Sequence, residues 1–314
     1  MPSDEQVLRR LKLRDLHTLK VIADWGSMAK AAAHLAMSQP AVSRAIAEME
    51  HSIGAPLLDR SPAGVQLTAF GEILLKRGLV VFDELNEGLQ EIEFLADPAV
   101  GEVRIGSTEP MTALVATIIQ RISSRFPKIV FHVAVHDTLT LHRRLRERDD
   151  DLAISRMSNS DQENDMQAEI LFHDPLVVIA GKHNPLTRRR HLSLRDIVDE
   201  PWILGEHGFL GPFIDEAFRS VGLETPKGRV VSPSTYLRNN LLLAGPFLAI
   251  QPEAMLRYPK PHPSLRALPV ELPTTWRPIG LITLKHRTMS PVADLVRSVA
   301  RDVAKSIPNT RRQK

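Results

Sequence analysis

Apolar residues recur at helical spacing through residues 13–54 and predict three short helices. The second helix begins after Ser27 and is rich in alanine, which keeps its bulk low enough for close packing against a partner helix. The third helix begins after Ser38, and Pro40 lies in its first turn, where a missing N–H group is harmless. This arrangement is typical of a helix-turn-helix unit.

The third predicted helix has an apolar face and a polar face. Its inward positions carry small or branched apolar side chains: Ala41, Val42, Ala45, Ile46 and Met49. Near its start, Gln39, Ser43 and Arg44 point outward and offer the polar groups that base edges and phosphates in a major groove require. An alanine-rich helical hairpin in an ordinary core is the alternative that this periodicity leaves open.

Residues 55–68 decide between these two interpretations. They predict two short strands about a Ser-Pro-Ala-Gly turn, which form a β-wing next to the helices. We therefore expect a winged helix-turn-helix domain over residues 11–68.

A single long helix is predicted for residues 69–96. At about 1.5 Å per residue it spans roughly 40 Å, which is longer than a small domain needs internally. Its apolar residues repeat at a spacing near 3.5, as in a coiled-coil seam: Phe70, Ile73, Leu74, Val80, Val81, Leu85, Leu89, Ile92 and Leu95. A long core helix is the alternative. Pro98 and Gly101 then predict a hinge after the helix.

From Glu102 onward strands and helices alternate, which predicts an α/β fold. The first three strands, with two intervening helices, are expected to form a parallel sheet with right-handed crossovers. Later strands predict a second lobe, before strands at Arg266–Leu268 and Ile279–Leu284 and a closing helix at Val292–Ser306 return the chain to the first. We expect an effector domain over residues 97–306, with lobe 1 at about 102–162 and 267–306 and lobe 2 at about 163–266.

Several polar residues lie next to predicted strand ends, where two α/β lobes usually bind a small ligand. The candidates for an anionic or hydroxylated ligand are Ser107, Thr108, Thr138, Arg156 and Ser232, with Ser234, Glu206 and His207 as weaker candidates. Helix capping is the alternative role for each hydroxyl, and a surface ion pair is the alternative for Arg156.

Composition narrows the class of protein. The 314 residues exceed one usual domain, and 43% hydrophobic content supports a real core. The chain has no cysteine, which excludes disulfides and peroxide sensing through a thiol. It shows no signal peptide and no long apolar run, so we expect a cytoplasmic protein without membrane contact. The net charge of +3 does not by itself indicate nucleic-acid binding.

Catalytic motifs are not found. The sequence contains no His-Glu-x-x-His, Gly-x-Ser-x-Gly or Walker motif, and the histidines are scattered without ligand spacing. We therefore expect no enzyme activity, no catalytic residue, no metal and no cofactor. The run Arg188-Arg189-Arg190 is expected in an exposed loop.

The chain closely resembles the LysR-type transcriptional regulators. The matching positions are dense and correctly spaced: Gly26-Ser27, Ala31-Ala32, Leu35, Ser38-Gln39-Pro40-Ala41-Val42-Ser43, Ile46, Glu50, Gly54, Leu57-Leu58, Arg60, Leu67-Thr68 and Gly71. We expect DNA contacts from Ser27, Ser38, Gln39, Pro40, Ser43, Arg44 and Arg60. One departure is Ala63 at the wing tip, where the family usually carries a basic residue.

The resemblance continues through Gly101–Gly106, Asp151–Ile154 and His183–Leu186, and it implies a two-lobed effector domain like that of periplasmic binding proteins. It also implies a sequence-specific regulator that binds a double-stranded DNA operator, responds to an organic acid or a sugar, and contacts RNA polymerase. The long helix is then expected to dimerise through a seam of Leu74, Val81, Leu85 and Leu89, giving homodimers and homotetramers.

Two other interpretations differ in class. In one, the chain is a solute-binding protein whose first 95 residues serve assembly, which the missing export signal and the wing motif disfavour. In the other, the chain binds DNA but another protein, rather than a small molecule, controls it.

Overall fold

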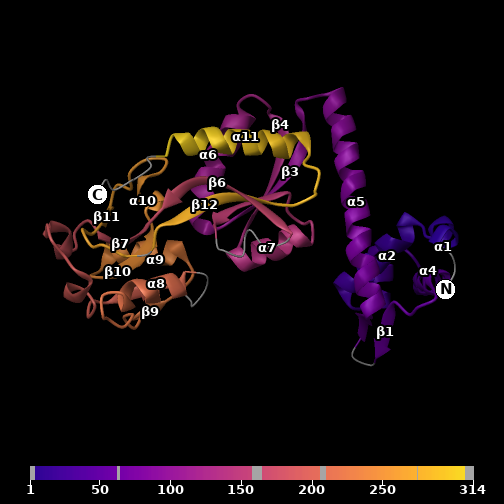
Figure 1. Cartoon of the computed structure of the whole chain (residues 1–314), viewed down its shortest axis with the longest axis horizontal. Coiled ribbons are helices and arrows are strands. Elements are labelled where there is room, and N and C mark those ends of the chain that lie inside the picture. Colours follow the sequence, from indigo (N-terminus) through magenta and orange to yellow (C-terminus); the bar gives the residue numbers. More distant parts are fainter. Residues whose placement is uncertain (1–3, 62–63, 158–164, 206–209, 274, 308–314) are drawn as a thin grey trace. The chain divides into compact units, whose positions relative to one another are not determined.

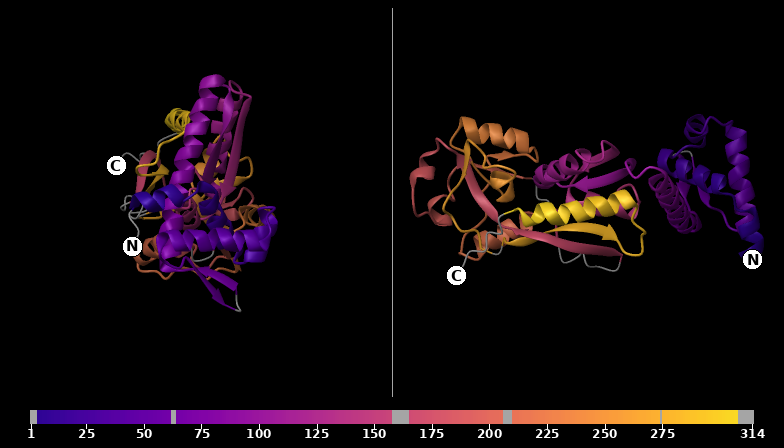
Figure 2. Two further views of the ribbon diagram at one scale, coloured as in Figure 1. Left: turned by 90° about the vertical axis from the view of Figure 1, so that its right-hand side faces the viewer. Right: turned by 90° about the horizontal axis from the view of Figure 1, so that it is seen from above.

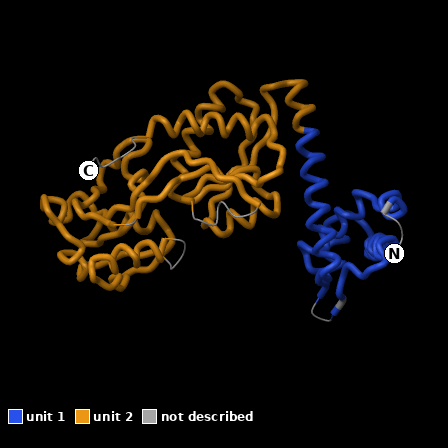
Figure 3. The backbone as a smooth tube through the Cα atoms, in the orientation of Figure 1, with its two compact units in different colours: residues 1–89 blue, residues 90–314 orange. Residues whose placement is uncertain are grey.

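The computed structural model describes residues 4–61, 64–157, 165–205, 210–273 and 275–307. The chain divides into two compact units, residues 1–89 and 90–314 (Figure 3). Ala63, Glu206, His207 and the basic tail from Arg311 lie outside the described residues. No helix among the described residues is both long enough and apolar enough to cross a membrane.

The first unit has the elements of a winged helix-turn-helix (Figure 1). Its elements are α1 (Asp4–Arg10), α2 (Leu13–Trp25), α3 (Met28–His34), α4 (Gln39–Ile53), β1 (Leu58–Ser61), β2 (Gly64–Leu67) and α5 (Ala69–Ala96), whose end lies in the second unit. Helices α2, α3 and α4 are the three that the hydrophobic pattern predicts, whereas α1 lies before the predicted domain. Strands β1 and β2 pair antiparallel and form the wing.

The predicted start and stop signals act as caps. Gly26 ends α2 in the left-handed conformation, with φ of 60°. The Ser27 hydroxyl accepts a hydrogen bond from the Lys30 N–H group, and the Ser38 hydroxyl accepts one from the Ala41 N–H group. These caps fix where α3 and α4 begin, and so fix the turn between them.

Helix α5 packs closely on the wing at its first turns. A Cβ atom on Gly71 would lie 2.2 Å from the Leu57 carbonyl oxygen, so this contact requires glycine. The Thr68 hydroxyl accepts from the Gly71 N–H group and donates to the Pro56 carbonyl. Leu74 is half-buried against the core of the first unit. Leu74 therefore differs from its exposed neighbours in the predicted dimer seam, and its place in the seam stays a prediction.

Lobe 1 of the second unit is built on a five-stranded sheet of order β4-β3-β5-β12-β6. Its elements are β3 (Val100–Ser107), η1 (Glu109–Met111), α6 (Thr112–Ser123), β4 (Lys128–Val135), α7 (Thr138–Arg146), β5 (Leu152–Arg156), β6 (Met166–Asp174), β12 (Arg277–Leu284) and α11 (Pro291–Lys305). Strands β4, β3 and β5 are parallel, as predicted, and β12 and β6 add to the sheet antiparallel.

One expected boundary is wrong. Residues 166–174 were expected to belong to lobe 2, but β6 pairs along its length with β12 and completes the sheet of lobe 1. The reason is physical: β12 returns from lobe 2 beside β5, and its other edge needs a partner strand. No local pattern in β6 distinguishes the two sheets.

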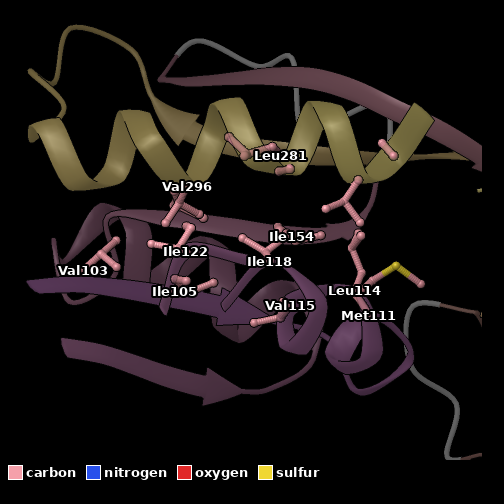
Figure 4. Close-up of a cluster of buried hydrophobic side chains, with 14 of the residues drawn as sticks. Val103, Ile105, Met111, Leu114, Val115, Ile118, Ile122, Ile154, Leu281 and Val296 are labelled. Atoms are coloured by element: carbon pink, nitrogen blue, oxygen red, sulfur yellow. The ribbon is translucent and has the colours of Figure 1, made fainter. Parts of the chain in front are cut away.

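Helices cover both faces of the lobe 1 sheet. Helices α6 and α11 pack on one face, with Ile118, Ile122 and Val296 meeting Ile105 and Ile154 of the strands (Figure 4). The right-hand view of Figure 2 shows α11, in yellow, running beside the strands of this sheet. Helix α7 covers the other face through Leu141 and Leu145. Both faces of the inner strands β5 and β12 are therefore buried, whereas the edge strand β4 is mostly exposed.

Lobe 2 is built on a second five-stranded sheet, of order β11-β7-β10-β8-β9. Its elements are β7 (Leu176–Gly181), η3 (Pro185–Arg188), η4 (Leu194–Asp196), β8 (Trp202–Leu204), α8 (Gly211–Arg219), β9 (Val230–Val231), α9 (Thr235–Ala244), β10 (Leu248–Pro252), α10 (Ala254–Arg257) and β11 (Leu265–Ala267). Strand β11 was expected to return to lobe 1. It pairs instead with β7, so the return comes only at β12.

Two segments carry the chain between the lobes: the step from β6 to β7 at Asp174–Leu176, and the stretch from β11 to β12. The strand registers show that the carboxyl edges of both sheets meet at the first segment. In lobe 1, Arg277 lies opposite Asp174, and in lobe 2, Pro252 at the end of β10 lies opposite Leu176. We call this region the interlobe edge.

Candidate nucleic-acid interface and effector site

Helix α4 presents an exposed polar start above a buried apolar face. Val42, Ala45, Ile46 and Met49 are buried, and Gln39, Pro40 and Arg44 are exposed. Ser43 is half-buried and Ala41 is half-buried on the core side. The positive end of the helix dipole adds to this surface, which suits an anionic partner. The predicted division of the helix into two faces is confirmed.

Two braces hold α4 and the wing in a fixed relation. The Glu50 carboxylate, near the end of α4, accepts hydrogen bonds from the Leu57 and Leu58 N–H groups at 2.8 and 3.2 Å. The Val65 N–H group donates to the Gly26 carbonyl at 3.0 Å, which ties strand β2 to the turn before α3. The helix and the wing therefore form one rigid surface. Sequence reasoning matched Glu50 to the family without finding this role.

The remaining predicted DNA contacts have different surroundings. Ser27 and Ser38 accept helix-cap hydrogen bonds through their hydroxyl oxygens, which leaves the hydroxyl hydrogen of each to donate to a phosphate. Arg60 lies on β1, but its side chain is outside what the structure describes. Its predicted phosphate contact therefore stays a prediction.

The rest of the predicted seam on α5 is exposed. Val81, Leu85 and Leu89 have exposed fractions of 45%, 48% and 64%. Ile92 and Leu95 continue the exposed apolar stripe to the end of the helix. A stripe of this length on one helix is typical of a surface that another protein chain covers.

The hydroxyl candidates of lobe 1 lie at the carboxyl ends of its parallel strands. Ser107 ends β3, is fully buried and donates its hydroxyl hydrogen to the Thr108 carbonyl. Thr108 precedes η1 and makes no side-chain cap bond to it. Thr138 is buried in the first turn of α7, where Asp137, not Thr138, is the cap. None of these three hydroxyls accepts a helix-capping hydrogen bond.

Arg156 is buried in an ion pair at the interlobe edge. Its Nη1 atom donates to the Asp174 carbonyl at 2.7 Å, and its Nη2 atom lies 3.5 Å from the Asp174 Oδ2 atom in a geometry that makes no hydrogen bond. Burial raises the pKa of Asp174 to about 6, although the positive charge of Arg156 opposes this shift. The alternative of an ion pair therefore applies to Arg156, but the pair is buried, not on the surface.

In lobe 2, Ser232 follows β9 and is half-buried. Its hydroxyl accepts a hydrogen bond from the Ser234 N–H group, and Ser234 in turn caps α9 through the Leu237 N–H group. Both serines therefore shape the start of α9. Arg188, Arg189 and Arg190 are exposed at the end of η3 and after it, as predicted.

Sequence reasoning missed three polar side chains of this region: Arg238 on α9, Gln251 on β10 and Arg277 at the start of β12. Each has a buried polar atom without a hydrogen-bond partner among the described residues. No sequence signal distinguishes them, because each lies inside an ordinary helix or strand. Within the same described part, no three acidic, histidine or cysteine side chains gather as a metal site would need.

Comparisons with known proteins give two family matches. Residues 13–72 match the model of the bacterial regulatory helix-turn-helix protein of the lysR family, and residues 96–305 match the LysR substrate binding domain. Together the two matches cover the winged helix and both α/β lobes.

Individual relatives match over nearly the whole chain. The HTH-type transcriptional regulator YybE of Bacillus subtilis is 29% identical, over 90% of this chain and 96% of its own length. GbpR of Azospirillum brasilense is 27% identical, over 93% of this chain and 86% of its own.

Solved structures share the fold at lower identity. Full-length OxyR from Pseudomonas aeruginosa has a TM-score of 0.69 at 20% identity and covers 97% of this chain and 99% of its own. Full-length CbnR in complex with its target DNA has a TM-score of 0.54 at 19% identity and covers 94% of this chain and all of its own.

Proposed function

Because the chain belongs to the LysR family of bacterial transcriptional regulators, we propose that the exposed start of α4 is its DNA-reading surface. As a member of that family, it binds DNA and responds to a small-molecule effector held in its substrate-binding domain. Gln39 and Arg44 reach base edges or phosphates in a major groove, with help from Ser43, Pro40 and the capping serines Ser27 and Ser38. Arg60 on the wing contacts a phosphate.

One observation carries this assignment most directly: polar groups at the start of α4 are exposed while its apolar face is fully packed. The Glu50 brace holds the wing beside these exposed side chains. The structure of CbnR bound to target DNA shows a protein of this fold on DNA, which supports the same surface here.

Assembly follows from the exposed stripe of α5. Full-length relatives oligomerise, and we assign the contact between two copies to Val81, Leu85 and Leu89, with Ile92 and Leu95 extending it. Leu74 contributes the part of its side chain that the winged-helix core leaves uncovered. Two paired helices place two winged helices on one operator. Homotetramers and a contact with RNA polymerase belong to the same proposal.

The effector, an anionic or polyhydroxylated metabolite, binds at the interlobe edge. Ser107, Thr108 and Thr138 offer hydroxyls at the strand ends of lobe 1, and Ser232 offers one from lobe 2. Arg156 contributes through its ion pair with Asp174 and stiffens the segment that joins the lobes.

The relatives reported above are regulators, not enzymes, and the protein acts in the cytoplasm, where its DNA partner is.

Selection of bound duplexes from a random DNA pool tests the proposed function. A dimeric regulator is expected to enrich an inverted repeat with half-sites on one face of the helix, about one helical turn or a multiple of it apart. Equal recovery of all sequences would contradict specific DNA reading and would favour a solute-binding protein with an assembly domain.

A further inference from the structure

Buried polar atoms without hydrogen-bond partners gather at the interlobe edge. Four such atoms belong to side chains on the strands that meet there: Arg156 Nη2, Asp174 Oδ2, Gln251 Oε1 and Arg277 Nε. A fifth, Arg238 Nε, belongs to α9 of lobe 2. Native proteins rarely leave buried polar atoms unpaired, because each one costs free energy unless a partner meets it. Their concentration in one place points to a bound molecule.

The strand topology explains why these side chains meet. Arg156 and Asp174 end β5 and β6, and Arg277 begins β12 opposite Asp174. Gln251 lies one residue before the end of β10, opposite Val177 of β7, the first strand of lobe 2. Gln251 has only 1% of its surface exposed, so its amide cannot be paired by bulk water.

Positive charge exceeds negative charge at this edge. Arg277 and the buried Arg156 lie close enough that their like charges lower the pKa of Arg156, beyond the larger effect of its burial. Asp174 is the carboxylate paired with Arg156, and burial raises its own pKa to about 6. Glu253 also lies near enough to raise that pKa, but its carboxylate is paired with Arg257. Neither carboxylate is therefore paired with Arg277.

A third guanidinium approaches from lobe 2. Burial lowers the pKa of Arg238, and the electrostatic partner that opposes this shift is Glu109, on the η1 segment of lobe 1. Arg238 therefore faces lobe 1, beside the Thr108 that precedes η1. Glu109 is exposed, so solvent weakens its attraction. With Glu253 and its partner Arg257 included, four arginines against three carboxylates leave an excess of one positive charge.

Arg277 is also held from lobe 2. Its guanidinium lies over the Phe213 ring of α8, with Cζ 4.6 Å from the ring centre. This contact orients the guanidinium without satisfying its N–H groups, which remain free to donate in the plane of the fork.

We propose that the effector of this regulator is an organic acid whose carboxylate is bound by Arg277 and Arg238, one from each lobe, and whose hydrogen-bond donor meets Oε1 of Gln251. This inference rests on the proposed function and selects the anionic class over the polyhydroxylated one. A neutral sugar would hydrogen-bond to the guanidinium groups but would leave the excess positive charge buried and uncompensated. A carboxylate meets both needs at once, because Arg forks bind carboxylates through two parallel hydrogen bonds.

Matched pairs of small molecules test the charge requirement. The full-length chain is screened by thermal shift and calorimetry with benzoate and benzamide, nicotinate and nicotinamide, and gluconate and glucose. At least one acid is expected to bind, and its neutral counterpart to bind about ten- to a hundredfold more weakly.

Variants then test the residues. Arg277→Gln and Arg238→Gln are each expected to weaken the acid about tenfold or more, whereas Arg277→Lys, which keeps the charge but loses the fork, falls between them and the wild type. Arg219→Gln removes an exposed guanidinium from α8 and serves as the matched control, with affinity unchanged. DNA binding and melting temperature, measured on the same samples, show that each variant is folded.

The outcomes separate this inference from the proposed function. Neutral molecules that bind as well as their acids, acids that bind Arg277→Gln and Arg238→Gln at wild-type affinity, or a panel with no acid that binds would each overturn the organic-acid assignment. Specific DNA selection by the same preparation would leave the regulator itself standing. A chain that selects no DNA sequence would overturn the proposed function instead.

Discussion

Gln39 and Arg44 are both exposed on α4, but their side chains can recognise different parts of DNA. A glutamine amide pairs with the edge of adenine, whereas an arginine also binds phosphate without regard to sequence. Gln39→Ala is expected to weaken binding to the selected operator by about 1–3 kcal/mol and to relax the preference at one base position. Competition binding with single-base operator variants at fixed salt measures both effects.

Arg44→Ala is the comparison for that experiment. As a phosphate contact, Arg44 should contribute almost equally to every sequence, so its loss lowers affinity across all variants and reduces the salt dependence. If Gln39→Ala left the base preference unchanged, Gln39 would not be a base-reading residue.

Asp174 gives the protein a pH dependence whose sign can be worked out. Its folded pKa, about 6, lies above the unfolded value near 3.9, so the folded chain binds the proton more tightly. The stabilisation from this proton is complete below the unfolded pKa and is lost as pH rises through 6. Asp174→Asn removes the linkage, so the stability of the variant relative to wild type should rise between pH 4 and pH 7, by up to about 3 kcal/mol.

Urea unfolding at several pH values, followed by the fluorescence of Trp202 and Trp276, measures this difference. Loss of the Arg156 partner can lower the stability of the variant at every pH. The proton on Asp174 is reported only by how the difference in unfolding free energy between the two proteins changes with pH. A constant gap between the two proteins from pH 4 to pH 7 would contradict a raised pKa at Asp174.

For single residues, the sequence predicts roles that depend on near neighbours in the chain better than roles that depend on distant partners. Ser27, Ser38 and Gly26 act as predicted, because a cap depends on residues three or four positions away. Arg156 could not be assigned in the same way. Its partner Asp174 is eighteen residues along the chain and is brought near only when β6 joins the sheet.

Among the elements, α5 offers a matched pair of glycines. Gly71→Ala places a methyl group 2.2 Å from the Leu57 carbonyl oxygen, and the backbone must shift, at a cost of about 1–3 kcal/mol. A Cβ atom on Gly88 meets nothing within 4 Å, so Gly88→Ala should stabilise the helix by about 0.5–1 kcal/mol. Denaturant unfolding followed by circular dichroism compares them. Equal effects at the two sites would show that α5 does not pack closely on the wing.

The exposed stripe of the same helix gives a test of assembly. Leu85→Lys puts a charge into the proposed contact between two copies and should cost several kcal/mol, so dimer formation and operator binding fail together. Asn86→Lys adds the same charge at the next, also exposed, position and is expected to leave the dimer intact. Sedimentation of each full-length protein reports its mass. A wild-type chain that stays monomeric at high concentration would exclude the seam.

Element types followed from the sequence, whereas sheet membership did not. Periodicity near 3.6 located α2 to α7 and α11, and short apolar runs located most strands. Strands β6 and β11 were assigned to the wrong lobes because a strand's partner depends on where the chain passes from one lobe to the other. Periodicity does not encode that point. The α1 helix was missed because its seven residues are mostly polar and exposed.

For the whole molecule, effector and DNA are coupled only through differential affinity, typically about 1–3 kcal/mol. Thr108→Val removes a hydroxyl that caps nothing while nearly keeping its shape, and is expected to reduce or abolish the effector response without changing operator affinity in its absence. Thr117→Val, on α6 away from the strand ends, is the control. Calorimetry and DNA binding on the same samples decide, and full effector affinity in both Thr108→Val and Thr138→Val would place the site elsewhere.

Lobe 1 is built from two separated parts of the chain, and this also sets the order in which the two units can fold during synthesis. Its core needs α11, whose Val292, Val296 and Val303 are fully packed, although the sheet beneath begins at residue 100. During synthesis at about 5–20 residues per second, the first unit is complete on the order of ten to forty seconds before that helix is made. A nascent chain therefore acquires a folded DNA-reading surface while its sensor is still unfinished. During that interval the chain can bind DNA before any metabolite can control it.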